Sequence, residues 1–155
     1  MTRVTSSILP ANAHLWTHVT DTDFLDCYRC RSDLDVDTAM QSALQMPRWA
    51  RALLSLRNRL VAPFGLKTGT SKDTTLFPIT HRSESEINLG IDDTHLNFRI
   101  GLLQHQGHIY MATWVHRNNL LGRIYLAVVM PFHILISRNA LRQVARATPA
   151  NTQIT

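Results

Sequence analysis

The sequence predicts a single α+β domain in which an antiparallel sheet packs against a long helix near the C-terminus. Three observations support this fold class. Apolar residues recur at three- and four-residue spacing from Thr38 to Val61, strand-like segments follow from Thr75 to His116, and an apolar stretch runs from Leu120 to Ile136. With 155 residues, the chain has the length of one domain.

The composition is that of a globular domain with a lightly charged surface, since 45% of the residues are hydrophobic and 17% are charged. We expect one ordered core from about residue 24 to residue 147. Residues 1–13 are small and polar and residues 148–155 lack periodicity, so both ends are predicted to be loosely held. Met1–Pro10 lacks the continuous apolar segment of a signal peptide, which predicts a cytoplasmic, reducing location.

The net positive charge does not predict a nucleic-acid-binding protein. Lys and Arg number 16 against 11 Asp and Glu, which gives +5, and such an excess attracts nucleic acid, anionic lipid or acidic small molecules. The basic residues lie among apolar ones in Arg48–Arg59 and Arg138–Arg146, without a run of five or more. Specific nucleic-acid binding is therefore not expected.

Cys27 and Cys30 form a lone C-x-x-C pair, which is typical of a redox pair or of half a zinc site. A zinc site needs two further ligands at finger-like spacing, and a thioredoxin-like pair begins a helix. Asp26–Arg31 instead alternates polar and apolar residues like a strand, which places the two cysteines on opposite faces. We interpret them as structural or incidental thiols.

The first predicted strand is Phe24–Cys30. Asp33, Asp35 and Asp37 follow it and supply acidic residues and an N-cap for a helix that begins near Asp37.

The helical pattern that follows, from Thr38 to Val61, is amphipathic. Pro47 splits it into two helices, and Pro63-Phe64-Gly65 ends the second. The second helix carries arginines away from its apolar face, namely Arg48, Arg51, Arg57 and Arg59.

Four further segments have strand-like composition, namely Thr75–Arg82, Glu86–Gly90, Leu96–Gln104 and His108–His116. The last two form the clearest pair, because alternate residues of each share one apolar face and a short turn at Gln106-Gly107 joins them as a hairpin. An antiparallel sheet of about four or five strands is therefore expected. The residues on the shared face are Leu96, Phe98, Ile100, Leu102, Ile109, Met111, Thr113 and Val115.

The apolar stretch Leu120–Ile136 continues as an amphipathic helix through Val144. Its 17 residues are at the lower limit for a membrane span, and Arg123, Pro131 and His133 interrupt it. A helix buried along the concave face of a sheet tolerates all three at its rim. The sequence therefore favours a buried helix over a membrane span.

Three segments occur in a familiar order: RNRLVAPFGLK at 57–67, GIDDTHLNFR at 90–99, and HRNNLLGRIY at 116–125, the last leading to Pro131-Phe132-His133. From about residue 24 to residue 147, the chain resembles the bacterial family catalogued as domain of unknown function 2867. The resemblance implies a helix-grip fold similar to the polyketide-cyclase and lipid-transfer superfamily, in which a curved antiparallel sheet wraps a long C-terminal helix around an apolar cavity. The predicted strands are fewer than in the full version of that fold, which implies a smaller or open cavity. The resemblance does not carry a function.

The densest group of ionisable residues comprises Asp92, Asp93, His95, Arg99, His116, Arg123 and His133. If the hairpin pairs as predicted, His95 and His116 lie together at the end away from its turn. In an enzyme, either histidine would act as general acid or base and Asp93 would orient it. Arg99 or Arg123 would hold an anionic substrate group. Alternatively, Asp93 pairs with one of these arginines at the sheet edge, and the histidines cap the strand–helix junction.

No metal and no cofactor are expected. His95, His116 and Asp93 are residue types that hold a divalent metal, but no H-x-H or H-E-x-x-H spacing unites them. Gly65–Thr70 contains Gly, Lys and Thr but not in the Walker order, and the chain has neither a nucleophile elbow nor a dinucleotide fingerprint.

The aromatic residues either line an apolar cavity or belong to the core. They are Trp49, Tyr110, Trp114, Tyr125 and Phe132. The residues that we expect to contact a ligand are Trp114, Arg123, Tyr125, Phe132 and His133.

Three functions remain open. The first, which we favour, is binding of a hydrophobic or amphipathic small molecule between the sheet and the C-terminal helix. The second is a cofactor-free cyclase or isomerase that acts through His95, His116, Asp93 and Arg99. The third is a peripheral membrane or protein-interaction module that uses the basic helix Arg48–Arg59. The oligomeric state is left open, with a homodimer as one alternative.

Overall fold

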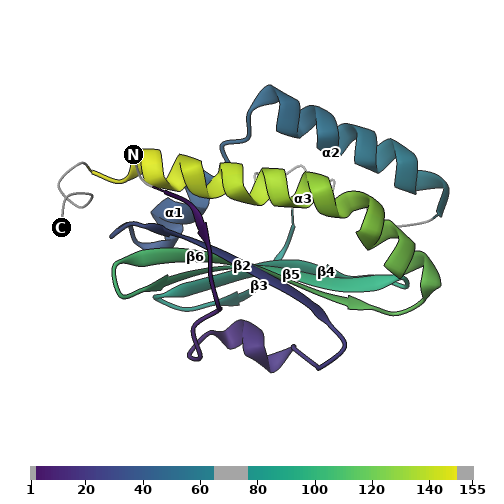
Figure 1. Ribbon diagram of the computed structural model, residues 1–155, viewed down its shortest axis with the longest axis horizontal. Coiled ribbons are helices and arrows are strands. Elements are labelled where there is room, and N and C mark those ends of the chain that lie inside the picture. The colour runs from purple at the N-terminus through teal and green to yellow at the C-terminus, as the bar shows by residue number, and fades with distance from the viewer. Residues whose placement is uncertain (1–2, 65–76, 150–155) are drawn as a thin grey trace.

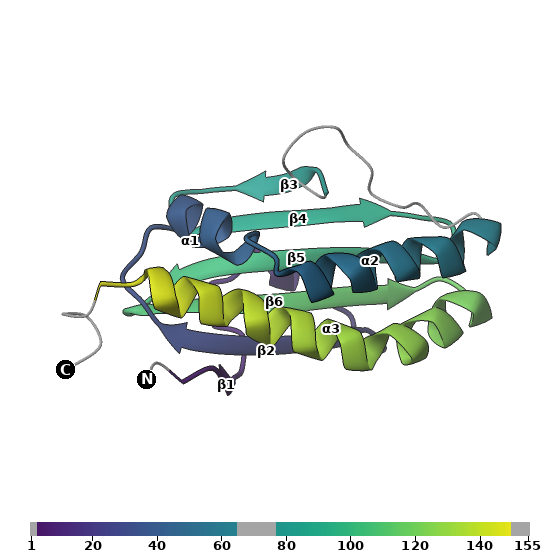
Figure 2. The ribbon, with the colours of Figure 1, turned by 90° about the horizontal axis from the view of Figure 1, so that it is seen from above.

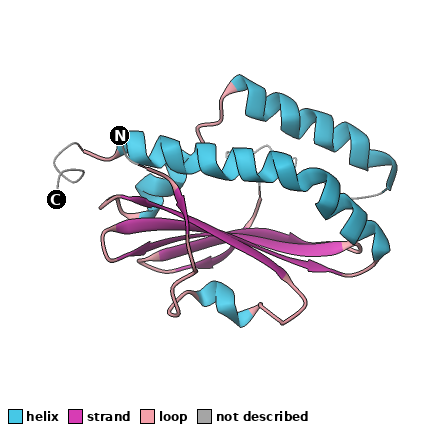
Figure 3. Ribbon diagram, in the orientation of Figure 1, coloured by secondary structure: helices cyan, strands magenta, loops and turns pink. Residues whose placement is uncertain are grey.

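The computed structural model describes residues 3–64 and 77–149 of the chain. These residues form a six-stranded sheet, three α-helices and two short 3-10 helices (Figures 1 and 3). All strand pairs are antiparallel, in the order β1-β2-β6-β5-β4-β3. The elements are β1 (Thr5–Ser6), η1 (His14–Thr17), β2 (Phe24–Arg31), α1 (Val36–Ala43), α2 (Arg48–Val61), η2 (Ala62–Phe64), β3 (Ile79–Arg82), β4 (Glu86–Asp92), β5 (Leu96–His105), β6 (His108–Arg117) and α3 (Leu120–Ala147).

The three α-helices lie on one face of the sheet and η1 lies on the other (Figure 1). We call these the helix face and the η1 face. α3 packs on β2 and β6, and α1 packs against α3, β4 and β5. α2 lies beside α3 and farther from the sheet (Figures 1 and 2). This arrangement confirms the predicted fold class, an α+β domain in which a long C-terminal helix packs on a curved antiparallel sheet.

The predicted hairpin is confirmed as β5 and β6. Ile100 lies opposite Thr113 in this pair, so the alternating residues expected to share a face do so, and that face is the helix face. The turn residues Gln106 and Gly107 have φ values of 47° and 72°. Two positive φ values are typical of a type I′ turn, whose twist matches that of the strands.

From Arg3 onward the N-terminal segment packs against the rest of the domain, which differs from the loosely held tail expected for residues 1–13. Thr5–Ser6 pairs with β2 and adds a sixth strand to the four or five expected. Val4 and Leu15 are buried. The buried Glu86 carboxylate accepts hydrogen bonds from the backbone N–H groups of His14 (2.7 Å) and Leu15 (3.2 Å). Packing and one buried carboxylate hold this segment, and neither produces a periodic pattern in the sequence.

At the other end of the chain, Thr148 is buried and its hydroxyl donates to Ser32 Oγ (2.7 Å). The rest of the expected C-terminal tail, from residue 150, lies outside the described residues, as do the segment Gly65–Thr70 and the start of the expected strand Thr75–Arg82.

The first two α-helices begin where the sequence places a cap and a break. α1 starts at Val36, because the Asp35 side chain accepts a hydrogen bond from the backbone N–H of Thr38 (2.9 Å). Pro47 separates α1 from α2, as predicted.

The start of α3 is held against the β4–β5 turn. The Asn119 side chain caps the helix by accepting a hydrogen bond from the backbone N–H of Gly122 (3.0 Å). A Cβ atom on Gly122 would lie 2.1 Å from the carbonyl oxygen of His95. Glycine at this position therefore allows the helix to approach the turn.

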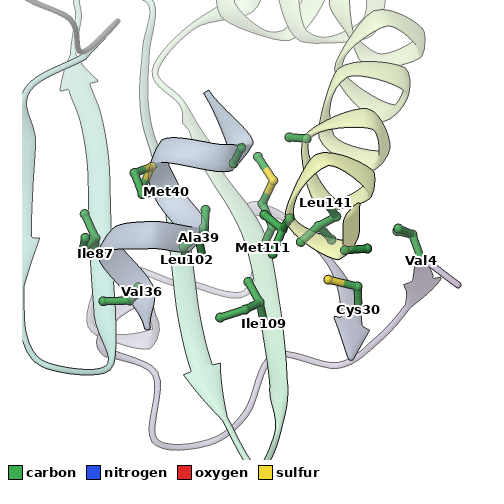
Figure 4. Packing of buried hydrophobic residues seen from close by; sticks show 14 of the residues in the cluster. Val4, Cys30, Val36, Ala39, Met40, Ile87, Leu102, Ile109, Met111 and Leu141 are labelled. Carbon is green, nitrogen blue, oxygen red and sulfur yellow. The ribbon is translucent and has the colours of Figure 1, made fainter. Parts of the chain in front are cut away.

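One end of the helix face, which we call the packed end, is filled by buried apolar side chains (Figure 4). It joins α1 and the C-terminal half of α3 to the sheet. Ala39, Leu141 and Val144 are completely buried there. The cluster consists of Val4, Cys30, Val36, Ala39, Met40, Ala43, Ile87, Leu89, Leu102, Ile109, Met111, Ala140, Leu141, Val144 and Ala145.

The N-terminal half of α3 is exposed along one side, so the predicted buried helix is buried mainly in its C-terminal half. Exposed apolar side chains form a row, here the α3 stripe, that consists of Leu120, Ile124, Val128, Phe132 and Leu135. Within the described residues, α3 alone has the length and composition of a membrane-crossing helix, and 17% of its most apolar 18-residue window is buried. Pro131 lies inside this half and removes one backbone N–H from the helical ladder.

Candidate functional site

The other end of the helix face, which we call the cavity end, encloses a cavity of about 220 Å³. The sheet wall is formed by Phe24, Leu96, Phe98, Ile100, Thr113 and Val115. The α3 wall includes Tyr125, Leu126, Val129, Phe132, His133 and Ile136. Leu53 and Leu56 close the cavity from α2. Its lining is therefore almost entirely apolar.

The mouth of the cavity lies between α2 and α3. Leu56, Val128 and Phe132 both line the cavity and expose 50%, 58% and 41% of their surface. Side chains that do both mark the place where the cavity meets solvent. The cavity therefore opens to solvent between the two helices, away from the packed end.

Besides Tyr125, two polar side chains lie in the lining, Thr113 of β6 and His133 of α3. His133 Nε2 lies 3.2 Å from Asp26 Oδ2 and 3.4 Å from Ser137 Oγ. Asp26 lies opposite Thr113 in the β2–β6 pair. Among the described residues, Thr113 Oγ1 and Asp26 Oδ1 are buried without a hydrogen-bond partner.

Three of the five residues expected to contact a ligand line this cavity, namely Tyr125, Phe132 and His133. Arg123 does not, because it lies exposed on the first turn of α3. Trp114 does not either, because its neighbours on both sides in β6 face the cavity and alternate residues of a strand face opposite sides.

The other expected aromatic residues also lie elsewhere. Trp114 and Tyr110 belong to a cluster with Leu15 and Cys27 on the η1 face. Trp49 of α2 is 44% exposed.

Arg99 lies on the η1 face, away from the cavity. It is buried, its Nη1 donates to Asp92 Oδ1 (2.8 Å), and its guanidinium carbon is 5.9 Å from the centre of the Trp114 ring. The arginine therefore pairs with Asp92 and not with Asp93. The backbone N–H of Asp93 donates to the carbonyl of Leu96 (3.0 Å), so this residue closes the β4–β5 turn.

His116 also lies on the η1 face. Asp23 bridges it to Trp114, since Asp23 Oδ1 is 2.6 Å from His116 Nδ1 and Asp23 Oδ2 accepts from Trp114 Nε1 (2.8 Å). Burial raises the pKa of Asp23, but the hydrogen bonds from His116 and Trp114, together with those from Thr20, outweigh it and lower the pKa to about 2. His116 therefore has a carboxylate that orients its ring, but it is not Asp93.

His95 belongs to the junction between β5 and α3. Its Nδ1 lies 3.0 Å from Nδ2 of Asn119, the residue that caps α3. His95 and His116 lie at the same end of the hairpin, as predicted, but they contact different partners. Within the described part of the chain, no three His, Cys, Asp or Glu side chains are grouped to hold a metal ion.

Cys27 and Cys30 are free and buried on opposite faces of β2, as their spacing predicts. Burial raises the pKa of each thiol to about 12, with the Asp26 carboxylate adding to the effect at Cys27. Thiols with such pKa values are poor nucleophiles and poor metal ligands at neutral pH. The structural interpretation of both cysteines is supported.

Sequence reasoning missed the contact between Asp26 and His133, which lie 107 residues apart. Because alternate residues of a strand share a face, Asp26 lies on the same face as Phe24, which is the helix face. No sequence pattern predicts that Asp26 contacts α3. A weak signal existed at Thr113, the single polar residue among the eight expected on the apolar face of the hairpin. An apolar face alone does not account for a hydroxyl at this position.

The comparisons with known proteins identify a family. The sequence profile of the family described as Protein of unknown function (DUF2867) matches residues 18–140. No curated protein and no solved structure gives a significant match to the chain. The matched range contains every described residue that lines the cavity, from Phe24 to Ile136. Because most of its length matches, the chain belongs to the DUF2867 family.

Proposed function

We propose that the protein binds a hydrophobic or amphipathic small molecule in the cavity between the sheet, α2 and α3. The observation that carries this proposal is the apolar cavity of about 220 Å³ with a mouth between two helices. Engineered apolar cavities of about 150 Å³ stay dry and take up benzene or xenon. The cavity therefore has room for a fused aromatic ring system or a short alkyl chain.

The apolar walls supply the binding free energy in this proposal. A ligand that buries about 200 Å² of apolar surface gains about 5 kcal/mol at about 25 cal/mol per Å². Taken alone, this gain corresponds to a dissociation constant of roughly 0.2 mM, and the loss of translational and rotational freedom on binding weakens the affinity. Binding experiments should therefore extend into the millimolar range.

The proposal includes a relationship to the helix-grip superfamily of polyketide cyclases and lipid-transfer proteins. It is supported by a curved antiparallel sheet, two helices between its second and third strands, and a long C-terminal helix across the same face. Six strands make the sheet small, and the cavity is correspondingly small and partly open. A cytoplasmic location belongs to the same proposal.

No reaction is proposed for this cavity. Of the residues named for a cyclase or isomerase, Arg99 and His116 lie on the η1 face, and His95 and Asp93 belong to the turn before β5. None of the four lines the cavity. A ligand held there would not contact them.

Native mass spectrometry with a library of lipids and aromatic metabolites tests the binding proposal. We expect the purified protein to retain at least one hydrophobic compound. Val129→Phe should abolish retention because the larger side chain fills the cavity, whereas Leu120→Phe, on the exposed stripe, should not. Absence of any bound compound, or retention that Val129→Phe leaves unchanged, would contradict the proposal.

A second candidate function is peripheral binding to a membrane surface, and the exposed α3 stripe favours it. The exposed Arg48, Arg51 and Arg59 of the neighbouring α2 would contact anionic headgroups. Cosedimentation with phosphatidylserine-containing vesicles tests it. The double substitution Ile124→Asp and Leu135→Asp should release the protein, and the cavity variant Val129→Phe should not. A protein that stays in the supernatant with anionic vesicles would eliminate this candidate.

A further inference from the structure

We infer that the cavity selects ligands that carry a hydroxyl or amino group, which binds at a polar pole formed by Asp26, Thr113 and His133. The inference rests on the proposed function, since it names the class of molecule that the cavity would bind. Thr113 and His133 belong to the cavity lining, which is otherwise apolar apart from Tyr125. Asp26 is not part of the lining but lies next to both residues, opposite Thr113 in the sheet and 3.2 Å from His133 Nε2.

Thr113 is the first element of the pole. It lines the cavity and is 5% exposed, and its hydroxyl has no hydrogen-bond partner among the described residues. Its neighbours on the same face of β6, Met111 and Val115, are apolar. A buried hydroxyl without a partner destabilises a fold, so its presence in a native core calls for a compensating role. Hydrogen bonding to a ligand group in the cavity is such a role.

Asp26 is the second element. It lies directly opposite Thr113 across the β2–β6 pair, on the same face of the sheet. One of its carboxylate oxygens is 3.2 Å from His133 Nε2, and the other, Oδ1, is buried without a partner. An ionised carboxylate accepts hydrogen bonds and cannot donate them. A ligand group that pairs with Asp26 Oδ1 must therefore be a hydrogen-bond donor.

His133 connects the pole to α3. Its Nε2 lies between the Asp26 carboxylate and Ser137 Oγ, one turn further along the helix, and Ser137 is buried. The ring is therefore held from β2 and from α3 at once, and its side chain is 16% exposed. A group fixed in this way keeps its geometry before a ligand binds, which lowers the entropic cost of recognition.

These features select among hydrophobic ligands. A neutral alcohol or phenol, or an amine, donates a hydrogen bond to Asp26 Oδ1, and its heteroatom can pair with the Thr113 hydroxyl. A hydrocarbon leaves both buried atoms without partners. A carboxylate, such as a fatty-acid anion, places a second negative charge beside Asp26 in apolar surroundings, where like charges repel strongly.

Three probes with one ring system separate these classes: 2-naphthol, 2-methylnaphthalene and 2-naphthoate. Titration of the full chain by fluorescence or calorimetry gives a dissociation constant for each. We expect 2-naphthol to bind at least about tenfold more tightly than 2-methylnaphthalene, because it satisfies buried polar atoms that the hydrocarbon does not. We expect 2-naphthoate to bind most weakly.

Two variants test whether the pole causes the preference for 2-naphthol. Thr113→Val keeps the shape of the side chain and should remove most of the naphthol preference while changing the affinity for 2-methylnaphthalene by no more than about twofold. Asp26→Asn removes the negative charge and should raise the affinity for 2-naphthoate, which provides a second reading if Thr113→Val does not fold. Thr17→Val, on η1 at the opposite face, is the matched control and should bind all three probes as the wild type does.

The results distinguish a failure of the polar pole from a failure of the proposed binding function. Three results would each overturn the pole and leave the proposed function standing: equal wild-type affinities for 2-naphthol and 2-methylnaphthalene, a naphthol preference that Thr113→Val leaves unchanged, or an affinity for 2-naphthoate that Asp26→Asn does not raise. If none of the three probes binds, the cavity itself is not a binding site and both proposals fail.

Discussion

The two ends of the helix face are built from the same helix and the same strands but are packed differently. At the packed end, Leu141 and Val144 of α3 are completely buried between α1 and the sheet. At the cavity end, Leu56 of α2 and Val128 and Phe132 of α3 are exposed around an unfilled space. The packed end thus forms the core, and the cavity end contains the site that we propose for ligand binding.

Side-chain size accounts for much of this difference. Small residues lie where helices meet the sheet at the packed end, including Ala39 of α1 and Ala140 of α3, and they allow close approach. At the cavity end α3 presents larger side chains, such as Tyr125 and Phe132. α2 lies farther from the sheet there (Figure 1). The large side chains of α3 hold α2 away from the sheet, and the space between α2, α3 and the sheet is not completely filled.

Leucine truncation at each end should give the largest difference. Leu141→Ala removes a fully buried side chain, and we expect the free energy of unfolding to fall by about 2–5 kcal/mol. Leu53→Ala, at the cavity wall, should cost less than about 1.5 kcal/mol, because its side chain already borders empty space and is partly exposed. Urea denaturation measures both values. Equal losses would remove the distinction between the ends.

Enlarging a side chain should give the next largest difference. Ala140→Phe places a ring in the packed end and should destabilise the protein by about 1–3 kcal/mol or more. Val129→Phe at the cavity end should change stability by less than about 1 kcal/mol, since the ring enters existing space. Thermal unfolding of the two variants checks this. A Val129→Phe protein as unstable as Ala140→Phe would mean that the cavity is closed in solution.

A smaller effect is expected at the polar pole, where the unpartnered hydroxyl should lower stability. Thr113→Val should raise the free energy of unfolding of the ligand-free protein by about 1 kcal/mol, because it removes a buried hydroxyl without a partner. Thr148→Val is the matched control. That hydroxyl is buried but donates to Ser32 (2.7 Å), so its loss should lower stability by about 1 kcal/mol. Destabilisation by both substitutions would indicate that Thr113 has a partner in solution.

Thiol alkylation should distinguish the two ends without changing stability appreciably. Cys30 belongs to the packed end and burial raises its pKa to about 12, so iodoacetamide at pH 8 should modify neither it nor Cys27 in the folded protein. A cysteine introduced by Leu56→Cys at the mouth should be modified rapidly. Mass spectrometry of the intact protein counts the alkylated sites. Rapid modification of Cys30 would show that the packed end opens readily.

The fold was largely predictable because its elements have local signals. Strict alternation identified β5 and β6, three-and-four spacing and Pro47 identified α1 and α2, and an unbroken apolar stretch identified α3. β1 was missed because two residues cannot show a period. The exposure of one side of α3 was also missed, since an apolar run does not reveal which of its side chains find partners.

The site was predictable only in part. Tyr125, Phe132 and His133 were identified because they lie on the helix expected to cover the sheet. Arg99 and His116 were grouped with His133 as ionisable residues close in the sequence, but strand alternation turns both toward the η1 face. The contact of His133 with Asp26 depends on how α3 crosses β2, and no local pattern encodes that crossing.

Methyl NMR during titration with 2-methylnaphthalene tests the central claim, that the cavity end binds a hydrophobic molecule, most directly. Methyl resonances of Ile100, Leu126 and Val129 at the cavity should shift with saturation, and those of Leu102, Ile109 and Leu141 at the packed end should not. Shifts confined to Leu120, Ile124 and Leu135 would place the probe on the exposed stripe. That result would contradict binding in the cavity.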